Sequence, residues 1–135
     1  MNRMIRGFTL IEMLIVVAIL AILVAIGYPA YRDQVMKSRR AEGMGELLEL
    51  ADRMERFYSG NGTYNGATLG ADADDVYETT TEKGNYTLGI TSATTTLFTI
   101  TATPNGPQGN DKCGTFTLTS SGQKSATGGG SCWKI

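Results

Sequence analysis

The hydrophobic residues of the chain are concentrated in one continuous run near its start. From Phe8 to Gly27, only Thr9 and Glu12 are polar. As a helix rising 1.5 Å per residue, these roughly twenty residues would cross about 30 Å of hydrocarbon. The run therefore predicts a membrane-spanning helix over residues 8–27. A plain membrane anchor and a secretory signal are the simplest interpretations, but a signal is shorter and is followed by a clean small-residue cleavage site, which is absent here.

Apolar residues then recur at steps of three and four, which predicts that the helix continues to residue 58 with one face buried. Pro29 lacks an amide donor and should weaken or kink the helix near Ala25. Gly43 and Gly45 should each cost the helix about 1 kcal/mol relative to Ala. The predicted buried face comprises Tyr31, Val35, Ser38, Ala41, Met44, Leu48 and Ala51, widened by Leu47 and Met54 near its end.

Residues 59–135 predict a small β-sheet head. A Gly- and Asn-rich stretch stops the helix, and three short alternating segments follow with short connections and no βαβ pattern. The predicted fold class is α+β: a long N-terminal helix, apolar in its first half and amphipathic in its second, packed on an antiparallel sheet. The alternating apolar residues are Tyr86, Leu88 and Ile90, then Phe98 and Ile100, then Phe116 and Leu118.

The composition narrows the possible chemistry. The 135 residues include no histidine, which excludes a Ser-His-Asp or Cys-His nucleophile and a His-based metal site. No paired carboxylates in an apolar setting are evident, so an enzyme is not expected. Asp72, Asp74 and Asp75 could surround calcium, but they lack EF-hand spacing, and a solvated acidic loop is the favoured interpretation.

The charge pattern does not favour nucleic acid. The net charge of -1 gives no general attraction to it. Arginines of the second half of the helix could touch DNA, but acidic residues alternate with them, so an ordinary charged helix face is favoured. These arginines are Arg39, Arg40, Arg53 and Arg56.

Cys113 and Cys132 are the only cysteines, and their spacing fits no metal cluster. A disulfide between them is expected, with two buried free thiols as the alternative. A disulfide implies that the C-terminal part reaches an oxidising compartment. The basic residues on both sides of the apolar run do not decide its orientation. The cysteines therefore favour an N-terminus inside the cell and a C-terminus outside.

Glu12 is a carboxylate within the apolar run, one helical turn from its start. A charge inside a membrane span costs about 2.5 to 3.5 kcal/mol on insertion scales, so this position needs a partner unless the side chain reaches the headgroups. Cleavage between Gly7 and Phe8 would create an ammonium one turn away. Before cleavage, Arg3 and Arg6 would hold that end at the cytoplasmic face.

The segment "RGFTLIEMLIVVAILAILVAIGYPAY" closely resembles the N-terminus of type IV pilins and of the related pseudopilins of type II secretion. A short basic leader ends in Gly, an aromatic residue follows, and a glutamate lies at a fixed spacing. The resemblance implies that prepilin peptidase removes residues 1–7 by cutting between Gly7 and Phe8, and that Phe8 is then N-methylated. It also implies that Glu12 pairs with the N-terminal amine of a neighbouring subunit during filament assembly.

The segment from Cys113 to Trp133 resembles, more loosely, the disulfide-bounded loop of type IVa pilins, and most of all small minor pilins of the PilE type. Secretion pseudopilins generally lack this bridge. The resemblance implies a structural subunit of a type IV pilus, minor rather than major, that needs no cofactor or metal and supports pilus assembly, twitching motility or adhesion. A pseudopilin and a plain membrane-anchored binding module remain the alternatives.

The same resemblance implies partners and location. The expected partners are other pilin subunits, the inner-membrane assembly machinery and prepilin peptidase, and nucleic acid is not expected. The precursor would lie in the inner membrane with its N-terminus in the cytoplasm and its head in the periplasm. After cleavage, the subunit would enter an extracellular filament.

Overall fold

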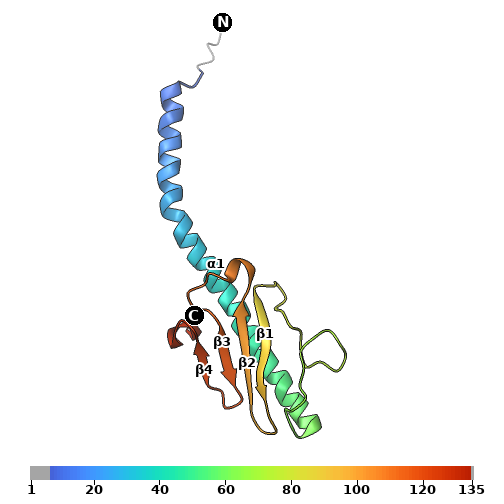
Figure 1. The fold of residues 1–135 in the computed structure, drawn as a ribbon. Helices are drawn as coiled ribbons and strands as arrows, with labels where there is room; N and C mark the ends of the chain where they lie inside the picture. Colours follow the sequence, from blue (N-terminus) through green and yellow to red (C-terminus); the bar gives the residue numbers. More distant parts are fainter. Residues whose placement is uncertain (1–6, 135) are drawn as a thin grey trace. The chain divides into compact units, whose positions relative to one another are not determined.

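The computed structural model describes residues 7–134, in which one long helix is followed by a four-stranded sheet (Figure 1). The chain forms two compact units, Met1–Val35 and Met36–Ile135, and the sheet belongs to the second. The helix was predicted over residues 8–58, and in the structure it runs from Leu10 to Asn61 with Pro29 inside it. The elements of the chain are α1 (Leu10–Asn61), β1 (Tyr86–Ala93), β2 (Phe98–Pro104), η1 (Gly106–Gln108), β3 (Phe116–Thr119), β4 (Lys124–Ala126) and η2 (Gly130–Trp133).

The sheet is the antiparallel meander that the short connections predicted. Its strand order is β1-β2-β3-β4, so every strand pairs with its neighbour in sequence. The inward-facing residues Tyr86, Phe98 and Phe116 come from the three predicted strands and are all buried. The fourth strand, β4, was not predicted, because Lys124, Ser125 and Ala126 show no apolar alternation.

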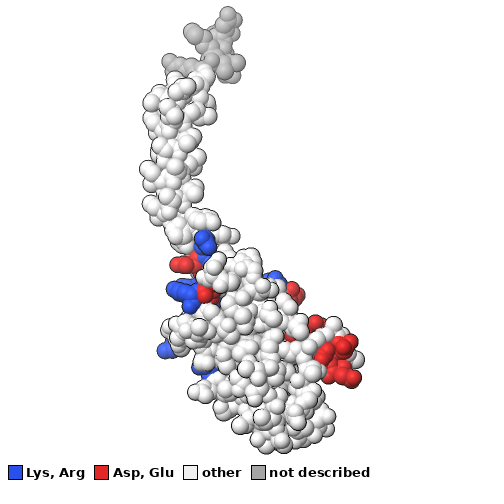
Figure 2. Space-filling model, in the orientation of Figure 1, with Lys and Arg blue, Asp and Glu red and all other residues white. Residues whose placement is uncertain are grey.

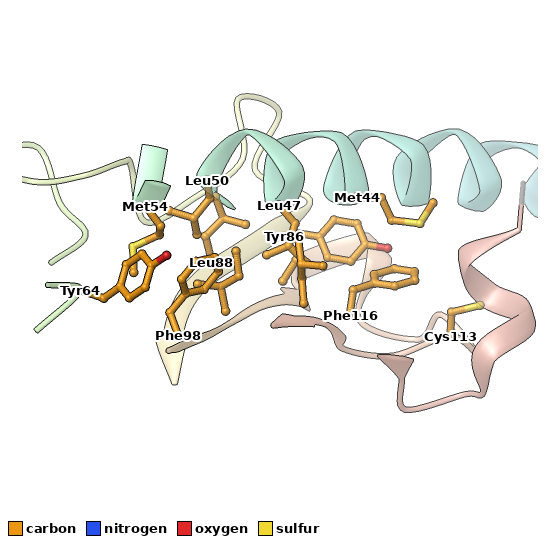
Figure 3. Close-up of a cluster of buried hydrophobic side chains, with 13 residues drawn as sticks. Met44, Leu47, Leu50, Met54, Tyr64, Tyr86, Leu88, Phe98, Cys113 and Phe116 are labelled. Atoms are coloured by element: carbon orange, nitrogen blue, oxygen red, sulfur yellow. The ribbon is translucent and has the colours of Figure 1, made fainter. Parts of the chain in front are cut away.

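The core lies between the inner face of the sheet and the C-terminal half of α1 (Figure 3). The predicted helix face is confirmed at Met44, Leu47 and Met54 and wrong on one side. Leu48 is 46% exposed, and Ser38 and Ala41 are also exposed. The buried side of the helix also includes three residues that were not predicted, Arg40, Gly43 and Leu50.

Gly43 explains where the sheet approaches the helix. A Cβ atom built on Gly43 would lie 2.7 Å from Cδ2 of Tyr86, so the tyrosine ring rests directly on the helix backbone. Only a residue without a side chain permits this contact between the ring and the backbone. Burial of the ring also raises the pKa of the Tyr86 hydroxyl to about 12. The packing of one aromatic ring thus selects the face of α1 that is buried, which the periodicity alone did not reveal.

Candidate assembly site

The first turn of α1 is closed by a capping box. The backbone N–H of Thr9 donates to Oε2 of Glu12 at 2.9 Å, and the backbone N–H of Glu12 donates to Oγ1 of Thr9 at 3.3 Å. The Thr9 hydroxyl also donates to Oε2 of Glu12 at 3.0 Å. Two amides that lack partners within the helix are satisfied in this way. Glu12 therefore stabilises the start of its own helix and holds its carboxylate beside the backbone of Thr9.

Sequence reasoning missed this cap, although the signal was present. Thr9 followed three residues later by Glu12, just before an apolar run, is the capping-box pattern. The sequence pattern suggested the carboxylate only as a partner for an ammonium. The geometry adds a second role, because the same carboxylate also satisfies the helix terminus.

The chain on both sides of Glu12, from Phe8 through the first part of α1, is apolar and exposed. Phe8 is 81% exposed, and the large aliphatic residues from Leu10 to Ile26 are also exposed. Within residues 7–134, α1 is long and apolar enough to cross a membrane, as judged by length and composition. An apolar surface of this extent requires a lipid or protein environment.

The Gly7–Phe8 peptide bond lies just before the helix. Gly7, Phe8 and Thr9 are outside regular secondary structure, and α1 begins at Leu10. A Cβ atom placed on Gly7 would meet no other described atom within 4 Å, and both Gly7 and Phe8 are exposed. A protease could therefore reach this bond without unwinding α1. Arg3 and Arg6, which were expected to hold the uncut end at the membrane surface, lie outside the described residues.

Cys113 and Cys132 form a disulfide, with their Cα atoms 5.7 Å apart. This is the expected pairing. The bridge joins the connection before β3 to η2, so it encloses β3 and β4 and holds η2 on the sheet. Trp133 in η2 adds an Nε1–H hydrogen bond of 2.7 Å to the backbone oxygen of Ser125 and an edge contact with Phe116.

A buried polar cluster connects α1 to the loop between β2 and β3. Nε of Arg40 donates to Oδ2 of Asp111 at 2.7 Å, and Nη2 of Arg40 donates to Oδ1 of the same carboxylate. Nε2 of Gln108 donates to the Tyr86 hydroxyl at 3.1 Å and to the backbone oxygen of Met36 at 3.3 Å. The interpretation of Arg40 as part of an ordinary charged helix face is wrong, because its guanidinium is buried against Asp111.

A pocket of about 260 Å³ adjoins the disulfide, and its charged lining is entirely basic. None of the described residues that line it is acidic, and its three lysines make no salt bridge with another described residue. Figure 2 shows blue side chains on the side of the head where Figure 1 places β4 and the C-terminus. The lining residues are Lys37, Arg40, Lys112, Cys113, Ser131, Cys132 and Lys134.

One group of acidic residues lies on the loop before β1, where Figure 2 shows a red cluster. The backbone N–H of Asp72 donates to Oδ2 of Asp75 at 3.0 Å, which shapes the predicted acidic loop. Glu46 on α1 accepts a hydrogen bond of 2.8 Å from the backbone N–H of Glu82, and desolvation raises the pKa of Glu46. Among residues 7–134, no group of three or more histidines, cysteines or carboxylates is placed to hold a metal ion.

Comparison with known protein families covers both parts of the chain. Residues 2–28 match the prokaryotic N-terminal methylation motif. Residues 29–117 match the family described as type IV minor pilin ComP, DNA uptake sequence receptor. The chain is a member of the type IV pilin family.

Curated relatives of this pilin are named as fimbrial proteins. A fimbrial protein of Dichelobacter nodosus is 36% identical over 131 residues, which is 95% of this chain and 79% of the relative. The type IV major fimbrial protein FimA of the same species is 45% identical over 74 residues, covering 55% of this chain and 43% of FimA. The pilin spans only about half the length of several curated relatives that it matches.

Two solved structures share the pilin fold. The Neisseria meningitidis non-core minor pilin PilV superposes with a TM-score of 0.56 at 23% identity, over 72% of this chain and 91% of PilV. A type IV pilin from Shewanella oneidensis gives a TM-score of 0.51 at 25% identity, over 74% of this chain and 99% of that pilin. These comparisons confirm the predicted fold class of a helix packed on an antiparallel sheet.

Proposed function

We propose that this pilin is a structural, non-enzymatic subunit of a type IV pilus, present as a minor component, which polymerises through the N-terminal part of α1. The observation that carries the proposal is an exposed apolar helix surface that begins with a capped carboxylate, Glu12. A bundle of such helices at the centre of a filament would give this surface a new apolar environment once it leaves the membrane. The twitching or adhesive role expected from the sequence would be carried out by the filament.

Processing is the first step of the proposed route. Prepilin peptidase would cut between Gly7 and Phe8, removing residues 1–7, and the new N-terminus at Phe8 would be methylated. The new ammonium would lie close to the Thr9 amide that already donates to Glu12. A neighbour's ammonium could then compete for the same carboxylate, which would neutralise both charges inside an apolar bundle.

The proposed processing also implies where the subunit lies before and after cleavage, and which proteins it meets. The precursor would be inserted in the inner membrane through residues 8–27, with the leader in the cytoplasm and the head, residues 59–135, in the periplasm. The Cys113–Cys132 disulfide supports a periplasmic head, because such bridges persist in oxidising compartments. Inner-membrane assembly machinery would then extract the cut subunit into the extracellular filament.

The experiment that tests this route compares Gly7→Val with the natural chain in cells that make pili. A β-branched residue at the cut site should block cleavage, so the variant should remain in the membrane at precursor mass. Mass spectrometry of the natural subunit from sheared filaments should show a chain that begins at methylated Phe8. Normal entry of Gly7→Val into filaments would exclude the proposed processing.

Recognition of DNA is a second candidate function. A nucleic-acid partner was not expected from the sequence, but the family that matches residues 29–117 is described as a DNA uptake sequence receptor. Lys37, Lys112 and Lys134 of the basic pocket could contact phosphates. Their position offers a surface for DNA even though the chain as a whole carries a charge of -1.

A gel-shift titration of the full chain in detergent with duplex DNA tests this candidate. Binding should weaken as salt rises, and replacing Lys112 and Lys134 by Gln should lower the salt slope by about 1 for each phosphate that is no longer neutralised. The double variant should retain the fold, because both side chains are exposed. If no shift occurs at low salt, the candidate is excluded and the pilus role is unaffected.

A further inference from the structure

The disulfide and the basic pocket form one feature of the head. Both Cys113 and Cys132 line the pocket, together with Lys37, Lys112 and Lys134. Arg40 also lines it, but its charge is offset by Asp111. Three lysines and both cysteines of the bridge thus line one pocket, and no carboxylate side chain of residues 7–134 lines the same space.

The two cysteine residues differ in their exposure. Cys113 is 1% exposed and belongs to the hydrophobic core, whereas Cys132 is partly exposed in η2. A nucleophile that enters the pocket from solvent therefore meets Cys132 first. Thiol–disulfide exchange requires a thiolate to approach one sulfur while the other sulfur leaves, so this asymmetry decides which sulfur is attacked.

We propose that this pocket is a thiol-exchange site that admits small anionic thiols, the chemical class of glutathione, and directs them to Sγ of Cys132. The incoming thiolate forms a new S–S bond with Cys132 while the Cys113–Cys132 bond breaks, and Sγ of Cys113 leaves as a thiolate. A second thiolate of the same kind attacks the sulfur of the bound thiol and releases Sγ of Cys132. The balance is two thiols consumed, one small disulfide formed and one protein disulfide reduced to two thiols.

Electrostatics favours this reaction at two stages. The lysines raise the local concentration of an anionic thiolate, and such steering increases association rates by about 10-fold or more at low salt. They also stabilise the negative charge that develops on the leaving sulfur of Cys113, because nearby cations favour a thiolate. A thiol with an ammonium group has a thiolate form of zero net charge, so it would gain only the second effect and no attraction in the first.

The opened bridge would free Cys132 while the rest of η2 stays in place. Without the disulfide, Trp133 keeps its contacts with Ser125 and Phe116, and its ring centroid remains 5.3 Å from Nζ of Lys124. These contacts hold the tryptophan, and the backbone N–H of Cys132 donates to the oxygen of Gly129 at 3.1 Å, so breaking the disulfide frees only the Cys132 side chain. The mixed disulfide at Cys132 would therefore be accommodated at the pocket mouth without unfolding the sheet.

The test measures exchange rates on the full natural chain in detergent. Glutathione, whose thiolate form is anionic, and cysteamine, whose thiolate form also carries an ammonium and has no net charge, are compared at equal thiolate concentration. The disappearance of the disulfide is followed by thiol labelling and mass. Glutathione should react roughly 10-fold faster than cysteamine at low salt, and the difference should shrink at high salt. Equal rates for the two thiols would overturn the proposal.

Two variants locate the effect. Replacing Lys112 and Lys134 by Gln should remove most of the preference for glutathione, whereas Lys83→Gln, a lysine outside the pocket, should leave the preference unchanged. Peptide mapping of the acid-quenched reaction should place the glutathione adduct on Cys132. An adduct on Cys113, or an unchanged preference in the double variant, would exclude the site.

Discussion

Gly43 and Gly45 lie two residues apart in α1, yet they meet different surroundings. A Cβ atom on Gly43 would lie less than 3 Å from three ring atoms of Tyr86, whereas a Cβ atom on Gly45 would meet nothing within 4 Å. Gly43 is therefore required by packing, and Gly45 only weakens the helix. Sequence reasoning assigned the two glycines the same cost, because helix propensity does not include what packs against the residue.

This contrast predicts opposite effects for the two Ala substitutions. Gly45→Ala should stabilise the protein by about 1 kcal/mol through helix propensity. Gly43→Ala should destabilise the protein, because the added methyl group would overpack the contact with Tyr86. Overpacking costs about 1 to 3 kcal/mol, which outweighs the gain in helix propensity that Ala brings at this position too. Thermal unfolding of the full chain in detergent, followed by near-ultraviolet circular dichroism, measures both. Equal midpoints for the two variants would contradict the close contact with Tyr86.

At the scale of elements, a buried ion pair joins α1 to the loop before β3. Side-chain exposure is 10% for Arg40 and 1% for Asp111, so both charges have left water. The pair also positions the loop that contains Gln108, whose Oε1 atom is buried without a hydrogen-bond partner among the described residues. Such a pair contributes little net stability, but removal of one partner is costly because the other charge stays buried.

Asp111→Asn should therefore destabilise the head by about 3 to 5 kcal/mol. The matched control is Asp52→Asn, which removes an exposed i,i+4 partner of Arg56 and should cost at most about 0.5 kcal/mol. Urea unfolding in detergent, followed by tryptophan fluorescence, reports the difference because Trp133 lies in the head. A similar midpoint for both variants would show that the buried pair does not hold α1 to the loop.

Gly128 fixes the turn that leads from β4 to η2. A Cβ atom there would collide with the backbone oxygen of Lys112 and would lie 2.8 Å from Cα of Cys113. Gly128→Ala should thus displace the segment that carries the disulfide and cost about 1 to 3 kcal/mol. Gly130→Ala, where nothing lies within 4 Å, is the control and should change the thermal midpoint little. Protease digestion of the C-terminal segment should increase only in Gly128→Ala.

The elements were predictable to the extent that each carried a periodic apolar signal. The long helix and the three strands with buried Tyr86, Phe98 and Phe116 were predicted, because alternation and helical spacing reflect burial directly. β4 was missed because its partner β3 supplies its hydrogen bonds while its own side chains bury little. The side of the buried helix face that was missed and the Arg40–Asp111 pair depend on tertiary approach, which no local pattern encodes.

At the scale of the whole molecule, the apolar surface between Leu10 and Ile26 must always be covered, first by lipid and then by other subunits in the proposed filament. Glu12 lies at the start of that surface, and its carboxylate has two roles that can be separated. One role is the cap that Glu12 forms with Thr9, and the other is the charge offered to a neighbour's ammonium.

Glu12→Gln tests the charge alone, because a glutamine side chain can still accept the Thr9 amide hydrogen bond of a capping box. This variant should be cut at Gly7 and inserted normally but should enter filaments poorly, since a neighbour's ammonium would be left without its counter-charge in an apolar bundle. Thr9→Ala is the matched variant: it removes the hydroxyl of the cap, at a cost of about 1 kcal/mol to the helix terminus, and keeps the carboxylate. The measurement is the amount of each variant in sheared filaments relative to the membrane pool. If Thr9→Ala is depleted and Glu12→Gln is not, the carboxylate acts through the helix cap and the proposed pairing between subunits is wrong.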